Sequence, residues 1–260
     1  MIIWPPLRRA WHNPIFHGGL EAFAQQPTQR SYSVNYVATL ATVLLITWPK
    51  EGFVNLRDLP FTYNAVGGVT MIILAYLSIS QGATRILGAR YLSLADWLRL
   101  APVSVGAFLR GYLAANCLEL LLFWGLAVPL LVLAAHVSGE PLVHLSAGLL
   151  LLLVCAGSYR IVGVTLLICF ERDEFLLYIC VCLLYMCFIL GSGFVFPLCN
   201  PVLAFADTSL WPHRLSSLTL PGIILPGWVA TVVFHMLLGG GSFIIALLRG
   251  YWVQRTRTQL

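Results

Sequence analysis

The feature that most constrains this chain is a series of apolar runs bounded by charged residues or proline. They fall at about 33–48, 63–82, 105–135, 143–170, 175–196 and 223–248. Several exceed the roughly 20 residues that a transmembrane helix needs. Only 10% of the residues are charged, whereas a soluble domain carries about 25%. The sequence predicts an all-α polytopic membrane protein with six transmembrane helices, forming a single domain over residues 1–260.

The basic residues indicate how these spans are oriented. Setting aside Arg160, which lies inside a span, eleven basic residues fall in the N-terminal segment, around the connection after the second span, at Arg172 or in the C-terminal tail. The loops on the opposite side hold three, namely Lys50, Arg57 and Arg214. Because cytoplasmic loops collect Lys and Arg, we expect both termini in the cytoplasm. An even number of spans agrees with this orientation.

Two segments outside the spans have unusual compositions. Residues 13–30 are too polar to cross a membrane yet carry large apolar side chains, which predicts a short helix lying in the cytoplasmic interface. Residues 197–222 are partly apolar but contain repeated prolines. We expect this segment to dip into the outer half of the membrane as a re-entrant segment, with protein or water satisfying its backbone. A plain proline-rich external loop is the alternative.

The chain lacks the motifs of common enzymes and nucleotide-binding proteins. It contains no G-x-x-x-x-G-K-[ST], no H-E-x-x-H, no G-x-S-x-G and no C-x-x-C pair. Six of the seven cysteines fall inside apolar runs, where cysteine packs as a small hydrophobic residue. We therefore expect no enzymatic activity, no metal site and no cofactor in this chain. Its net charge of +5 reflects loop arginines rather than a nucleic-acid partner.

Two ionisable residues lie inside predicted spans, where a charge is costly and is normally paired. Glu119 follows Arg110 by nine residues, and Arg160 precedes Glu171 by eleven. At about 1.5 Å per residue, both lie roughly 15 Å from the cytoplasmic edge. The sequence therefore predicts a buried Glu119–Arg160 ion pair between the third and fourth spans. The pair either fixes only the packing of the two helices, or forms part of a polar pathway or hinge.

The connection after the second span contains a short amphipathic pattern. Within LADWLRLAP (residues 94–102), apolar residues recur at i, i+3, i+4 and i+7, while Asp96 and Arg99 fall on the other face. Pro102 ends the helix because the residue before a proline avoids the helical conformation. Residues 90–104 are therefore predicted to form a helix on the cytoplasmic surface, directly before the third span.

Three features of the chain resemble the six-span permease subunits of ATP-binding cassette exporters of the type-2 class. NPI at 13–15, followed by Glu21, is similar to the start of the interface helix in that family. DWLRLAPVS at 96–104, leading to LRG at 109–111, is similar to the segment between its second and third spans. The proline-broken segment before the last span resembles its external re-entrant segment. The resemblance covers the whole predicted topology.

This resemblance implies a function and a set of partners. The chain would be the membrane-spanning permease subunit of an ATP-driven exporter in the bacterial plasma (inner) membrane. Segment 90–104 would be a coupling helix that sits in a cleft of a separate ATPase subunit, and the turn 171–174 would form a smaller contact. A second permease copy, or a related permease, would complete the translocation path, and ATP and Mg²⁺ would bind to the ATPase. The residues expected to contact the ATPase are Asp96, Trp97, Arg99, Leu100, Pro102, Glu171, Arg172 and Asp173.

The sequence is also compatible with a function of a different class. The chain could be a membrane-embedded scaffold or assembly factor that transports nothing. Co-purification with an ATPase would distinguish the two functions.

Overall fold

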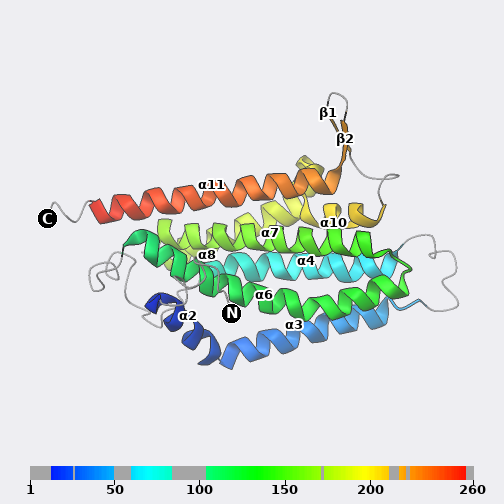
Figure 1. Ribbon diagram of the computed structural model, residues 1–260, viewed down its shortest axis with the longest axis horizontal. Coiled ribbons are helices and arrows are strands. Elements are labelled where there is room, and N and C mark those ends of the chain that lie inside the picture. Colours follow the sequence, from blue (N-terminus) through cyan, green and yellow to red (C-terminus); the bar gives the residue numbers. More distant parts are fainter. Residues whose placement is uncertain are drawn as a thin grey trace, which may run out of the picture.

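The chain folds into a bundle of long helices that run along one common axis (Figure 1). The computed structural model describes residues 13–25, 27–49, 60–83, 104–170, 173–210, 217–220 and 223–255. Within these ranges the elements are α2 (Pro14–Gln25), α3 (Pro27–Ile46), α4 (Phe61–Gly82), α6 (Val105–Val137), α7 (Leu142–Cys169), α8 (Glu174–Met186), the π-helix η2 (Cys187–Gly191), α9 (Ser192–Val195), the 3₁₀-helix η3 (Pro197–Cys199), α10 (Pro201–Leu210), the strands β1 (Ser217–Leu220) and β2 (Ile223–Pro226), and α11 (Gly227–Arg255).

Five helices are long and apolar enough to cross a membrane, namely α4, α6, α7, the run from α8 through α9, and α11. The prediction of a predominantly helical integral membrane protein is therefore confirmed, and the strand pair β1–β2 departs from the all-α expectation. The first predicted span falls on α3, where the apolar part, Ser31–Ile46, is shorter. The six-span layout stays a prediction.

Two predicted boundaries are wrong. The interface helix expected over 13–30 ends at Gln25, and residues 27–30 form the first turn of α3. Proline suits the first position of a helix, where its missing N–H removes no hydrogen bond. The last span was expected from residue 223, but Ile223–Pro226 pairs antiparallel with β1. The helix starts at Gly227 and continues beyond residue 248 to Arg255.

Helices α4 and α7 form the centre of the bundle. More than half of the apolar window of each is buried, 56% and 67%, against 28% or less for the other three candidate spans. The two helices approach closely where Gly82 meets Gly163. A Cβ on Gly82 would lie 2.4 Å from the carbonyl oxygen of Arg160, and a Cβ on Gly163 would lie 2.3 Å from that of Ile79. Only glycine allows this backbone contact.

The run from α8 through α9, the fourth of these five candidate spans, changes character along its length. It begins as an α-helix capped by Asp173, whose Oδ1 accepts from the N–H of Leu176 at 2.9 Å, and becomes a π-helix over Cys187–Gly191. A π turn leaves a carbonyl available for another donor, and the carbonyl of Ile189 accepts from Nδ2 of Asn200 at 2.8 Å. Asn200 in turn caps α10, because its Oδ1 accepts from the N–H groups of Val202 and Leu203.

Helix α10 lies alongside the N-terminal ends of α4 and α7 (Figure 1). The ring of Phe205 fills the space beside Gly67 and Gly148. Each glycine lies six residues, about 9 Å, from the nearer end of its helix. Within segment 197–222, α10 therefore packs against α4 and α7 about two turns from the N-terminal ends of those helices. The re-entrant path itself stays a prediction, because residues 211–216 and 221–222 lie outside the described residues.

Candidate functional site

Three polar side chains, from α4 and α6, meet around Arg160 on α7, which is 1% exposed. Its Nη1 donates to Oε2 of Glu119 at 3.1 Å and to Oδ1 of Asn116 at 3.2 Å, both on α6. Its Nη2 donates to Oε1 of Gln81 on α4 at 3.0 Å. The structure thus brings Glu119 and Arg160 together, and it adds Asn116 and Gln81. We refer to these four residues as the Arg160 cluster.

The two added residues were missed in the sequence. Asn116 precedes Glu119 by three residues, which places both on one helix face. This spacing could have been used to predict that Asn116 belongs to the cluster. Gln81 lies in the last turn of α4, and only the packing of α4 on α7 reveals its role.

The Arg160 cluster balances charge inside the bundle. One guanidinium faces one carboxylate, so the predicted ion pair carries no net charge, and Glu119 is 9% exposed. Removing one partner of such a pair costs about 3–5 kcal/mol, because it leaves an uncompensated buried charge. Within the described part of the chain, Nε of Arg160 and Nε2 of Gln81 have no hydrogen-bond partner. The cluster therefore combines a strong charge pair with unused donors.

The Arg160 cluster also links the last turn of α4 to positions eleven and fourteen residues beyond Val105, the first residue of α6. Gln81 lies next to the last residue of α4, Gly82, whose carbonyl oxygen accepts from the hydroxyl of Tyr112 on α6 at 3.3 Å. Tyr112 precedes Asn116 by one helical turn. A displacement of the end of α4 would therefore reach the cluster directly through Gln81, whereas a displacement of the start of α6 would reach it through about three turns of helix.

A second buried polar group joins α7 to α11. Tyr159 and His235 are both fully buried, and the hydroxyl of Tyr159 lies 2.8 Å from Nε2 of His235. Nδ1 of His235 lies 2.8 Å from the carbonyl oxygen of Thr231. Because a carbonyl only accepts, Nδ1 carries a hydrogen, and in the neutral ring Nε2 accepts from Tyr159. Phe188, in the π turn, stacks on Tyr159 with ring centroids 5.2 Å apart.

No role was predicted for His235 from the sequence. The available signal was an ionisable residue inside an apolar span, which is a candidate functional residue by default. Its partner lies 76 residues earlier in the chain, and no local pattern indicates that contact.

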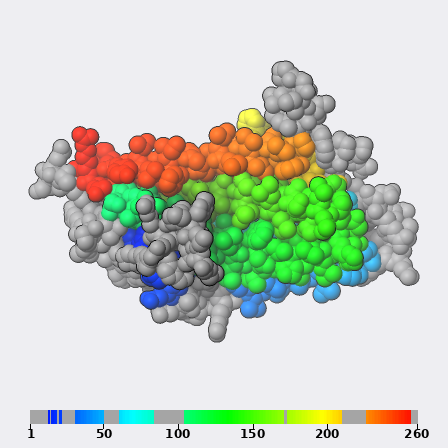
Figure 2. All heavy atoms as spheres, in the orientation of Figure 1, coloured from blue at the N-terminus to red at the C-terminus, as the bar shows by residue number. Residues whose placement is uncertain are grey.

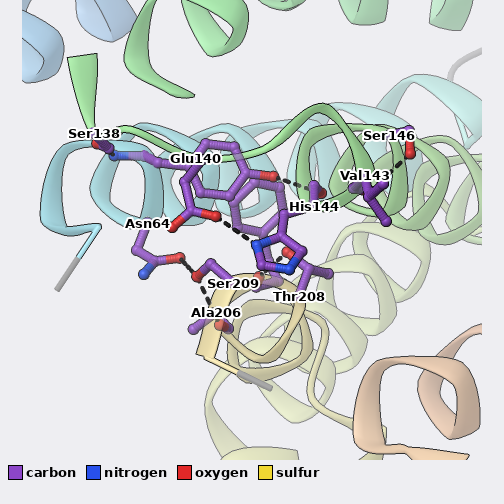
Figure 3. Close-up of polar contacts among 11 residues, drawn as sticks. Asn64, Ser138, Glu140, Val143, His144, Ser146, Ala206, Thr208 and Ser209 are labelled. Atoms are coloured by element: carbon purple, nitrogen blue, oxygen red, sulfur yellow. Dashed lines mark hydrogen bonds and ion pairs between the residues drawn. The ribbon is translucent and has the colours of Figure 1, made fainter. Parts of the chain in front are cut away.

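Polar contacts also join α4, α7 and α10 at the end of the bundle predicted to be external (Figure 3). Nδ1 of His144 lies 2.6 Å from Oε2 of Glu140, which is nearly buried. The hydroxyl of Tyr63 donates to the carbonyl oxygen of His144 at 3.1 Å. Nearby, the hydroxyl of Ser209 donates to Oδ1 of Asn64 at 2.9 Å. These contacts fix the packing of the three helices at this end.

The predicted interface helix is tied to the start of α6. Asn13 caps α2, because its Oδ1 accepts from the N–H of Ile15 at 3.0 Å. Its Nδ2 donates to the carbonyl oxygen of Ala107 at 2.7 Å, and its side chain occupies the space above Gly111, where a Cβ would lie 2.7 Å away. Helix α2 is thereby attached to the helix that follows segment 84–103.

Most of the residues expected to contact an ATPase lie outside the described residues. These are Asp96, Trp97, Arg99, Leu100, Pro102, Glu171 and Arg172. Asp173 is described, and its carboxylate caps α8. Its expected contact with an ATPase stays a prediction.

Among the described residues, no group of three His, Cys, Asp or Glu side chains could hold a metal ion. No protein-family model matches the chain, and no curated protein matches it.

Proposed function

We propose that this chain is the membrane-spanning permease subunit of an ATP-driven exporter. In this proposal α3 is the first of six spans, both termini lie in the cytoplasm of a bacterial cell, and the external re-entrant segment precedes α11. A separate ATPase subunit binds ATP and Mg²⁺ and contacts the coupling helix at 90–104. A second permease copy, or a related permease, completes the translocation path.

One observation carries the proposal most directly. The end of α4 that precedes segment 84–103 is attached to the Arg160 cluster through Gln81, and the cluster is held to α6 by Asn116 and Glu119, about three turns beyond the start of that helix. A partner that pushes on this segment would act on a buried charge network in the membrane, and not only on a surface loop. The tight Gly82–Gly163 contact beside it gives α4 a fixed point on α7 about which to tilt.

The arrangement of the helix ends supports the same function. Helix α2 and the C-terminal end of α11 lie at one end of the bundle, opposite the β1–β2 pair (Figure 1). Helix α2 contacts α6 through Asn13. A partner at this end would therefore meet α2, the start of α6 and the segment that precedes it.

The experiment that tests the proposal is affinity purification of the full chain from its native membrane, followed by assays of ATP hydrolysis and identification of the co-purified proteins. We expect an ATPase subunit to co-purify. The triple variant Asp96→Ala/Arg99→Ala/Leu100→Ala should lose it. A matched triple variant on the predicted external side, Lys50→Ala/Arg57→Ala/Arg214→Ala, should keep it.

Two results would count against the proposal. Retention of the ATPase by the Asp96/Arg99/Leu100 variant would refute the coupling helix. Purification of the intact chain with other membrane proteins but without an ATPase would favour the scaffold function instead.

A further inference from the structure

The paired ends of α6 and α11 carry a group of exposed arginine and aromatic side chains. Helix α11 continues to Arg255, seven residues or about 10 Å beyond the predicted end of the apolar span. Tyr251 and Trp252, in these last turns, are 54% and 57% exposed. Arg249 and Arg255 are exposed as well.

The start of α6 lies directly against this part of α11. Cγ1 of Val105 occupies the position beside Gly250, 2.5 Å from where a Cβ would stand. One residue later, a Cβ on Gly106 would lie 3.8 Å from Nη1 of Arg110 and 3.8 Å from the hydroxyl oxygen of Tyr251. A cation from α6 and a hydroxyl from α11 therefore border the same notch. Figure 2 shows the two helix ends in contact on the molecular surface.

Arg249 is held in place by an aromatic ring. Its Cζ lies 4.5 Å from the ring centroid of Trp252, a distance at which a guanidinium is attracted to the face of an indole. Tryptophan and tyrosine gather where a membrane protein passes from hydrocarbon to headgroups. The stack therefore places a positive charge at headgroup level.

The two helix ends themselves carry charges of one sign. Residues 104–113 and 246–255 contain Arg110, Arg249 and Arg255 and no Asp or Glu. Within the described part of the chain, neither Arg110 nor Arg249 forms an ion pair. We refer to Arg110, Arg249, Tyr251, Trp252 and Arg255 as the basic-aromatic patch.

We propose that the basic-aromatic patch binds the headgroup of an acidic phospholipid in the leaflet next to it. Guanidinium groups form paired, charge-assisted hydrogen bonds with phosphate oxygens, and the tyrosine hydroxyl adds a donor. The two aromatic rings lie at the depth of the glycerol and the upper acyl chains. This binding goes beyond transport and does not depend on the exporter function.

The proposal can be tested by native mass spectrometry of the full chain in detergent, titrated with phosphatidylglycerol or with phosphatidylcholine. The wild-type chain should retain phosphatidylglycerol in preference to phosphatidylcholine. Each arginine near an anionic lipid surface contributes about a fivefold gain in affinity, so Arg110→Gln/Arg249→Gln should weaken phosphatidylglycerol binding by roughly 10- to 30-fold. The control Arg57→Gln/Arg214→Gln removes the same charge from the loops that are predicted to lie on the other side of the membrane, and it should leave binding within about twofold.

A second variant keeps the test independent of net charge. Trp252→Leu preserves every arginine but removes the ring that holds Arg249, and it should weaken phosphatidylglycerol binding by about two- to fivefold. Equal binding of the two lipids by the wild-type chain would overturn the proposal. Equal losses in the two double-arginine variants would also overturn it, because they would reveal a general effect of charge.

Discussion

Replacing Arg160 with methionine should destabilise the bundle through the charge that is left behind. Methionine fills much of the same space, but Glu119 then keeps a carboxylate that is only 9% exposed and lacks its cation. Loss of one partner from a buried ion pair costs about 3–5 kcal/mol. The two amide side chains that accept from Arg160 also lose a donor, which places the cost toward the upper part of that range.

A double-mutant cycle separates the charge effect from the loss of packing. Glu119→Gln alone leaves the guanidinium of Arg160 without a counter-ion and should also destabilise. The double variant Glu119→Gln/Arg160→Met removes both charges, and an apolar replacement of a buried pair is often nearly neutral. The double variant should therefore lose less unfolding free energy than the two single variants together, by about 2–3 kcal/mol.

Thermal unfolding of the detergent-solubilised protein, followed through its eight tryptophans, measures these differences. For a chain of this size about 1 kcal/mol corresponds to a Tm change of about 2–4 °C, so Arg160→Met should lower Tm by at least about 6 °C. Arg110→Met, which removes an exposed arginine on α6, should change stability by less than about 0.5 kcal/mol. Strict additivity of the two single losses, or an unchanged Tm for Arg160→Met, would refute the reasoning.

Three further predictions concern the packing of α4, α7, α10 and α11. Gly82→Ala should push α4 away from α7 and lower the free energy of unfolding by about 1–3 kcal/mol. As a control, a Cβ on Gly125 would meet no atom within 4 Å in the described part of the chain. Gly125→Ala should therefore be neutral, or stabilising by up to about 1 kcal/mol, in the same unfolding assay. Tyr159→Phe should cost about 1–3 kcal/mol by leaving a ring nitrogen of His235 buried without its donor, and Tyr159→Phe/His235→Phe should recover part of that loss. Asp207→Ala should lower stability by about 1–2 kcal/mol, because its carboxylate accepts from an N–H in the first turn of α11 at 3.0 Å, while Asp207→Asn should retain most of the capping.

The membrane-spanning helices could be predicted because their signal is local. Composition and length mark each apolar run, and the structure has a helix in each of them, although the last run begins with the strand Ile223–Pro226. The Glu119–Arg160 contact could also be predicted, because helix rise gives the depth of each residue and their two predicted spans follow one another in the chain. In each case the inference needed only helix rise and neighbouring spans.

Contacts between distant helices could not be predicted in this way. The Tyr159–His235 contact depends on how α11 packs on α7, and the contribution of Gln81 depends on the glycine contact between α4 and α7. The start of α3 was misassigned for a different reason. Polar residues such as Gln29 indicated a separate interface segment, but backbone hydrogen bonding continues the helix whatever the polarity of its side chains.

The most direct test of the proposed function is site-specific photo-crosslinking in the native membrane. A photoreactive amino acid at Trp97, within the predicted coupling helix, should crosslink to a nucleotide-binding ATPase subunit. The same group at Leu142, an exposed residue at the opposite end of the bundle, should not. Crosslinking of both positions to lipid or to unrelated membrane proteins, with no ATPase at position 97, would contradict the exporter function.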